Sequence, residues 1–107
     1  MCYRYSVPGP DSLVKRFSAV FLEEVPFKRQ YHASSFDLPK LPVIADQHPT
    51  QIQLFTWGLI PFWVKDHKTA EEVRLKTMNA RAESIFEKPS FRHAAGKQHC
   101  LVLADGF

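Results

Sequence analysis

Residues 51–57, Gln-Ile-Gln-Leu-Phe-Thr-Trp, decide the fold class of this chain. Polar and apolar side chains alternate loosely along this stretch, which predicts a β-strand with one buried face. The residues from Asp46 to Thr50, just before it, favour a turn, and Val43-Ile44 can start another strand ahead of that turn. Strands therefore organise the middle of the chain.

Helical signals lie on either side of these strands. One apolar stripe at helical spacing predicts an amphipathic helix that Asp11 or Ser12 would cap and that ends before Pro26. The charged residues 65–76 predict a short exposed helix, and residues 91–95 predict one helical turn. The apolar stripe consists of Leu13, Phe17, Val20 and Phe21.

The rest of the chain completes a mixed pattern. Residues 2–7 and 99–103 predict two further strands, and residues 28–42, with Pro39 and Pro42, predict a loop. Strands and short helices without the regular spacing of βαβ units predict an α+β fold.

Composition excludes several classes of protein. The chain has 107 residues, of which 45% are apolar and 23% charged, and this balance argues against disorder, collagen and coiled coils. The formal net charge of +3 is a mild basic bias that is compatible with nucleic acid. The first residues contain no signal peptide, and no apolar run reaches the ~20 residues of a membrane span. Two cysteines favour a reducing cytoplasm, and Cys100 is read as a buried core thiol.

Cys2 is the residue with the most specific chemistry. A small residue after the initiator methionine permits removal of Met1, which would leave Cys2 as the amino terminus. A free α-amine and a thiol titrate close to each other, so the amine can act as an internal base for the thiol. Together they form a 1,2-aminothiol, which condenses with an aldehyde through an imine to a thiazolidine ring. The alternative is an incidental cysteine whose amine Met1 blocks.

Two other stretches could bind a nucleic acid. The aromatic residues between Trp57 and Trp63 could stack on bases, or could pack onto the core. In Asn79-Ala80-Arg81-Ala82-Glu83, a strand would place Asn79, Arg81 and Glu83 on one face, where the guanidinium suits phosphate. The alternative is an ordinary solvated face.

Searches for cofactor and metal motifs find nothing. There is no glycine-rich phosphate loop, no paired-cysteine zinc spacing and no HExxH motif, so we expect no cofactor and no metal. The histidines lack metal-ligand spacing and are read as surface or core residues. They are His32, His48, His67, His93 and His99.

Five stretches together resemble the SRAP family, the SOS response-associated peptidases, which are also called abasic-site processing proteins. The resemblance covers nearly the whole chain, and the ordered set is specific although each stretch alone is weak. The stretches run from Met1 to Tyr5, Trp57 to Trp63, Asn79 to Glu83, Lys88 to Phe91, and Cys100 to Phe107.

The resemblance implies a function in the SOS response to DNA damage. Its members bind single-stranded DNA, and their amino-terminal cysteine, here Cys2, forms a thiazolidine crosslink to the aldehyde of an abasic site and removes a short propeptide. By position, Cys2 and Asn79 would be catalytic, and Arg4, Trp63, Asn79 and Arg81 would bind DNA. The implied fold is a curved, barrel-like antiparallel sheet with short helices. The implied location is the cytoplasm, in association with the nucleoid, without a membrane partner.

Departures from the family limit what this chain should do. Tyr3 replaces a common glycine, Val64 replaces an aromatic residue of some members, and His32 replaces a common asparagine. Family domains are about twice as long, and their catalytic glutamate and histidine would follow Phe107. Residues 1–107 therefore resemble the amino-terminal portion of a single SRAP domain, expected to be weakly active or inactive as an autopeptidase and crosslinking enzyme. The alternatives are a non-catalytic module that binds single-stranded DNA and a structural or protein-binding domain. The oligomeric state stays open.

Overall fold

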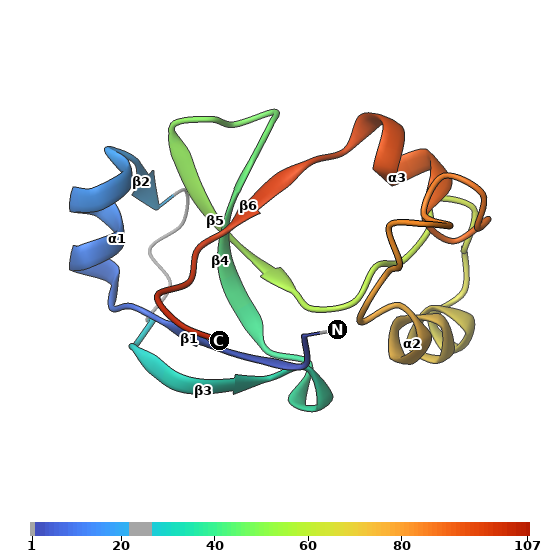
Figure 1. Ribbon diagram of the computed structural model, residues 1–107, viewed down its shortest axis with the longest axis horizontal. Coiled ribbons are helices and arrows are strands. Elements are labelled where there is room, and N and C mark those ends of the chain that lie inside the picture. Colours follow the sequence, from blue (N-terminus) through green and yellow to red (C-terminus); the bar gives the residue numbers. More distant parts are fainter. Residues whose placement is uncertain (1, 22–26) are drawn as a thin grey trace.

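The computed structural model describes residues 2–21 and 27–107, and its α+β architecture confirms the predicted fold class. Strands gather at the left and centre of Figure 1, with α1 on the left and α2 and α3 on the right. The elements in chain order are β1 (Arg4–Val7), α1 (Pro10–Phe17), β2 (Val20–Phe21), β3 (Gln30–Ser34), the 3-10 helix η1 (Ser35–Asp37), β4 (Lys40–Ala45), β5 (Gln51–Thr56), α2 (His67–Lys76), α3 (Arg92–Lys97) and β6 (Cys100–Val102).

The strands form two sheets rather than one. The larger sheet has the order β2-β5-β4-β6, in which β4 is antiparallel to both neighbours and β2 runs parallel to β5. The smaller sheet pairs β1 with β3 in antiparallel fashion. An isolated bridge joins Ser6 to Gly106, and across the described ranges the strands do not close into a barrel. The expectation of a single, barrel-like antiparallel sheet is therefore corrected.

Two apolar clusters hold these sheets together. The first contains Leu13 of α1 and Ile52 of β5, and the second contains Tyr5 and Val7 of β1. Phe27 packs against both clusters, so the two sheets share one continuous core. The alternation predicted for β5 is visible here, because Ile52 is fully buried whereas Phe55 points to the other face and is 43% exposed.

Helix α1 is shorter than its apolar stripe predicts. Gly9, rather than Asp11 or Ser12, is the N-cap, and Pro10 occupies the first turn, where its missing N–H costs nothing. Ser18 adopts a left-handed conformation and ends the helix. Val20 and Phe21 then form β2, since pairing with Gln51 and Ile52 overrides the helical pattern. Pro26 lies outside the described residues.

The loop predicted over residues 28–42 is also corrected, because it contains β3 and the start of β4. β3 is stabilised by pairing with β1, a partner far away in sequence that local patterns do not reveal. β4 continues through Pro42, which is fully buried and whose carbonyl accepts a hydrogen bond from the Leu103 N–H. The structure confirms the other predicted elements, although their ends are shifted. The four strands are β1, β4, β5 and β6, the charged helix is α2, and the later helical turn is α3.

A polar network fastens the segment after β6 to β1. The Ser6 hydroxyl donates to Asp105 Oδ1 at 2.6 Å, and Arg29 forms an ion pair with Asp105 Oδ2 at 2.8 Å. Two backbone hydrogen bonds strengthen this network: the Ser6 N–H donates to the Gly106 carbonyl, and the Asp105 N–H donates to the Ser6 carbonyl. The hydrogen bond from Ser6, followed by Arg29, lowers the pKa of the Asp105 carboxyl below its usual value.

We expect Asp105→Asn to lower the free energy of unfolding near neutral pH, because the variant loses a contribution of the Asp105 carboxylate that depends on pH. The pKa of Asp105 is lower in the folded state than its ordinary value of 3.8. The carboxylate therefore stabilises the fold fully at a pH above 3.8, and this stabilisation is lost as the pH falls through the lower folded-state pKa. Melting temperatures of wild type and variant, measured from about pH 7 to pH 2, should therefore converge at the acid end. A gap in melting temperature that stays constant over this range would contradict the role assigned to Asp105.

Candidate functional site around Cys2

Cys2 lies directly before β1 and is tied to a distant part of the chain. Its backbone N–H donates to Asn79 Oδ1 at 3.1 Å, across 77 positions of sequence. Its thiol donates to the Arg4 carbonyl at 3.2 Å, and the residue is exposed. The main-chain nitrogen and the sulfur of Cys2 are thus both held in place while remaining accessible to solvent.

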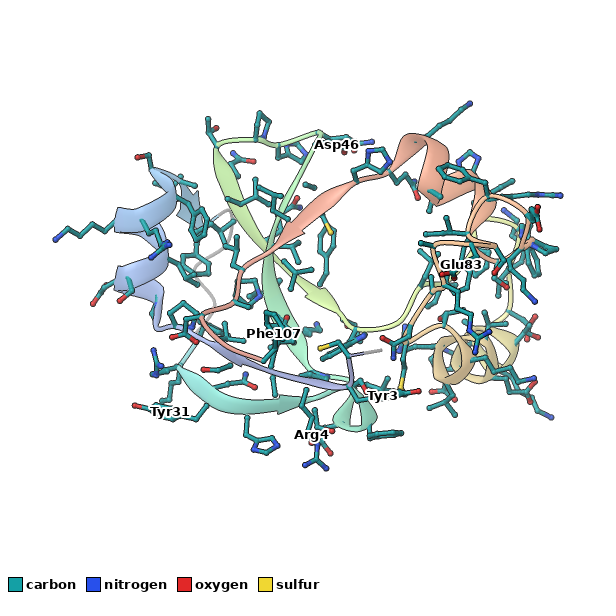
Figure 2. The ribbon with its side chains drawn as sticks, in the orientation of Figure 1. Tyr3, Arg4, Tyr31, Asp46, Glu83 and Phe107 are labelled. Atoms are coloured by element: carbon teal, nitrogen blue, oxygen red, sulfur yellow. The ribbon has the colours of Figure 1, made fainter. Side chains whose placement is uncertain are left out.

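The first of two hollows beside Cys2, here called the polar hollow, contains the residues singled out after α2. Cys2 and residues 79–84 line an open space of about 710 Å³. This segment is an irregular stretch that continues into turns at residue 82, not a strand, yet Asn79, Arg81 and Glu83 all line the hollow. Figure 2 labels Glu83 on this segment, between α2 and α3. The polar hollow therefore combines a thiol with an amide, a cation and an anion.

The second hollow, here called the apolar hollow, has Cys2 in its lining too. It measures about 670 Å³ and is lined mainly by apolar side chains of β4, β5 and β6, together with Tyr5, Trp57 and Cys100. The prediction of a buried Cys100 is wrong, because this residue is exposed on β6. Partial desolvation by the walls of the hollow and, secondly, the Asp46 carboxylate raise the pKa of the Cys100 thiol.

Tyr5 and Trp57 line the apolar hollow together with Cys2 and connect this hollow to the segment that carries Asn79. The Tyr5 and Trp57 rings lie 5.3 Å apart between centroids, and the Trp57 indole N–H donates to the Met78 carbonyl at 2.9 Å. Burial, followed by smaller contributions of the Cys2 and Cys100 thiols, raises the pKa of Tyr5 to about 12. Trp57 is thus partly buried against the core, as one of the two readings of the aromatic residues expected, and its hydrogen bond to Met78 adds a supporting role that the sequence did not reveal.

We expect Trp57→Phe to lower the free energy of unfolding by about 1–3 kcal/mol, because the Met78 carbonyl loses its partner while an aromatic ring remains. Urea denaturation followed by far-UV circular dichroism measures this change. The matched control is Trp63→Phe, which alters a half-exposed tryptophan and should cost less than about 0.5 kcal/mol. Equal losses in the two variants would remove the support for a positioning role of Trp57.

The other predicted DNA-binding residues lie outside both hollows. Arg4 is exposed on β1, donates to His32 Nε2 at 3.2 Å and points away from the centre of the molecule in Figure 2. Trp63 lines a narrow cleft in which the Phe62 and His93 rings lie 4.6 Å apart. The structure thus brings together Cys2, Asn79 and Arg81, and it leaves Arg4 and Trp63 on separate parts of the surface.

The described part of the chain holds no cluster of three or more histidine, cysteine or acidic side chains that could bind a metal. Its helices are also too short or too polar for a membrane span. The polar hollow itself offers a thiol, an amide, a guanidinium and a carboxylate around an exposed residue near the amino terminus.

Comparisons with known proteins agree on one family. The family model described as SOS response associated peptidase (SRAP) matches residues 1–107. The abasic site processing protein YoqW of Bacillus subtilis is 36% identical over 112 residues, which cover 100% of this chain and 46% of that protein. The abasic site processing protein HMCES of Rattus norvegicus is 41% identical over 64 residues, which cover 59% of this chain and 18% of that protein.

Solved structures give the same result for the fold. A crystal structure of a Bacteroides thetaiotaomicron protein matches with a TM-score of 0.82 and 37% identity, over 94% of this chain and 45% of that one. A crystal structure of a Bordetella bronchiseptica protein matches with a TM-score of 0.71 and 29% identity, over 97% of this chain and 48% of that one. The chain spans about half the length of the curated relatives it matches.

Proposed function

The chain belongs to the SOS response associated peptidase (SRAP) family, and from this premise we propose that residues 1–107 form the amino-terminal portion of a domain that processes abasic sites in single-stranded DNA. The observation that carries the proposal is the hydrogen bond from the Cys2 nitrogen to Asn79 Oδ1. It holds the nitrogen and thiol of Cys2 beside the polar hollow, where Arg81 is available for a phosphate.

The proposed reaction needs only the aminothiol of Cys2 with its amine free, after removal of Met1. The amine attacks the aldehyde carbon of the ring-opened abasic sugar, and loss of water gives an imine. The thiol then adds to the imine carbon, and its proton passes to nitrogen, which closes a thiazolidine and leaves the oxidation state unchanged. The Cys2 thiol, which now donates to the Arg4 carbonyl, must leave that bond before it can react.

We assign the surrounding residues roles that fit their positions. Asn79 orients the amine, Arg81 binds a phosphate next to the lesion, and Arg4 and Trp63 contact the flanking strand on the outer surface. The resemblance implies a catalytic glutamate and histidine in the part of the relatives that this chain does not match. Proton transfers at the sugar should therefore be slow, and the same holds for a cysteine-type autopeptidase activity.

A second candidate is a non-catalytic module for single-stranded DNA in the cytoplasm, and the exposure of its aromatic loop favours it. Phe62 and Trp63 are 64% and 48% exposed, so both rings can stack on bases, and the net charge of +3 attracts phosphate. Such a module would bind intact and abasic strands equally, with an affinity that falls steeply as salt rises.

One incubation separates the two candidates. Protein whose amino-terminal mass shows removal of Met1 is incubated for hours with a labelled single strand that carries one abasic site, or with the intact strand. We expect a slowly accumulating band that survives denaturing electrophoresis with the abasic strand alone. Equal, salt-sensitive binding of both strands without a covalent band would overturn the crosslinking function for this chain and leave the binding module.

A further inference from the structure

Two aromatic rings stack on each other at the surface, next to Cys2 in the chain. The Tyr3 and Phe36 ring centroids lie 5.4 Å apart, and the two ring planes are nearly parallel, at 16°. Both side chains stay open to solvent, since Tyr3 is 40% and Phe36 65% exposed. Rings that served the core would be covered, so this pair, here called the aromatic platform, offers a flat apolar surface to a partner.

The backbone holds the two rings of the aromatic platform in place. The Ser35 N–H donates to the Tyr3 carbonyl at 2.8 Å, and Ser35 itself is fully buried. Phe36 is the middle residue of η1, a single turn that begins where β3 ends. Arg4 pairs with Ser34 in the register of β1 and β3. Because the two segments are fixed to each other, a partner that stacks on the aromatic platform does not have to order it first.

A guanidinium lies next to the aromatic platform in the chain and has no acidic partner. Arg4 follows Tyr3 directly, and its Nη1 donates to His32 Nε2 at 3.2 Å, which positions the guanidinium. Arg4 forms no ion pair with an acidic side chain of residues 2–21 or 27–107. Tyr3 and Arg4 both lie at the lower edge of the molecule in Figure 2. Two open rings beside such a cation suit a nucleotide, which combines a flat base with a phosphate.

We propose that the aromatic platform stacks on the base of the nucleotide that flanks the abasic site, and that Arg4 binds the phosphate beside this base. This role rests on the proposed function of Cys2. Tyr3 follows Cys2 directly, so a strand whose abasic sugar lies at Cys2 brings a neighbouring nucleotide to Tyr3. The abasic sugar has no base of its own, and the nearest surface for stacking is therefore that of its neighbour. The contact is particular to this chain, because Tyr3 replaces a common glycine of the family.

A protein partner fits this surface less well. Tyrosine, phenylalanine and arginine are also frequent at protein interfaces, but a stable complex covers about 800 Å² on each partner. The aromatic platform and Arg4 are three side chains, which is the size of a site for one nucleotide. Stacking of one base on aromatic side chains makes a measurable contribution to affinity on its own.

The test measures binding of the 107-residue chain to a short single strand that carries a tetrahydrofuran in place of one nucleotide. This abasic analogue has no aldehyde, so fluorescence anisotropy measures the contacts without a crosslink. We expect Phe36→Ala to raise the dissociation constant at least about fivefold and Phe36→Tyr to restore it. The matched control is Tyr31→Ala, which removes an exposed ring at the other end of β3 (Figure 2) and should change the constant less than about twofold.

Removal of the stacked base from the strand provides a second measurement, which does not depend on how a variant folds. Two further strands carry a second tetrahydrofuran directly on the 5′ or on the 3′ side of the first. We expect one of them to bind wild type at least about fivefold more weakly than the original strand does, but to bind Phe36→Ala no more weakly. Losses from the base and from Phe36 that simply add would overturn the proposal.

The outcomes separate the aromatic platform from the reaction of Cys2. If Phe36→Ala binds the strand as tightly as wild type does while wild type crosslinks a natural abasic strand, the platform is overturned alone, and its rings are left to a protein partner. If the two base deletions identify the platform but wild type forms no crosslink, the reaction is overturned alone. If wild type binds none of the strands, both are overturned.

Discussion

Gly58→Ala is expected to lower the free energy of unfolding by about 2–5 kcal/mol, one of the largest effects of any conservative change in this chain. Gly58 has φ +101°, a conformation that an L-residue adopts only with strain. A Cβ here would also lie 2.4 Å from Arg74 Cγ and 3.0 Å from the Arg74 carbonyl oxygen. The side chain can move away, but the carbonyl belongs to the last turn of α2 and cannot move alone.

The consequences of Gly58→Ala should reach the site, because Arg74 is connected to it through the backbone. The Thr77 N–H donates to the Arg74 carbonyl, and the Thr77 hydroxyl donates to the Leu59 carbonyl at 2.7 Å. Displacement of this turn shifts the chain just before Asn79. We therefore expect the variant to lose the hydrogen bond from Cys2 to Asn79, which NMR can follow through the Cys2 amide in protein that retains Met1.

Gly96→Ala provides the control for this substitution. Gly96 lies within α3, and a Cβ there would meet no atom within 4 Å. Alanine in a helix is better than glycine by about 0.5–1 kcal/mol, so this variant should be slightly more stable than wild type. Urea midpoints that are equal for Gly58→Ala and wild type would show that the loop after β5 adapts without strain.

The parts of the fold that could be predicted from the sequence are those that local chemistry determines. The alternation of residues 51–57 predicts β5 because burial of Ile52 and exposure of Phe55 follow from the two faces of one strand. Helix α2 could likewise be predicted from the charged residues 65–76, and in the structure Asp66 caps it. β3 is invisible because its stability comes from pairing with β1.

The site shows the same division between local and long-range information. Cys2 can be singled out by its chemistry alone, but nothing in the residue pattern joins it to Asn79, and only the family resemblance does. The support from Trp57 is missed because its hydrogen bond to Met78 depends on tertiary structure. Cys100 is misread because an apolar strand is assumed to be covered, whereas β6 is exposed on this chain.

Cys2→Ser is expected to abolish the stable crosslink to an abasic strand while leaving a transient one. The serine variant keeps an α-amine beside Asn79, so it can still form an imine, but its hydroxyl cannot close a thiazolidine. We expect no denaturation-resistant band without a reductant and a band after addition of cyanoborohydride, which reduces the imine to a stable amine. Wild type should give its band without the reductant, because sulfur has already captured the imine carbon.

The complementary variant keeps the thiol and removes the amine. A chain with one extra, uncleaved residue before Cys2 retains the Cys2 N–H that donates to Asn79, but as an amide that cannot form an imine. It should give no band with or without cyanoborohydride, although its thiol reacts with iodoacetamide. A band from this blocked chain would mean that the thiol acts alone. A band from Cys2→Ser without the reductant would mean that another nucleophile forms the crosslink, and either result would remove the aminothiol from the proposed reaction.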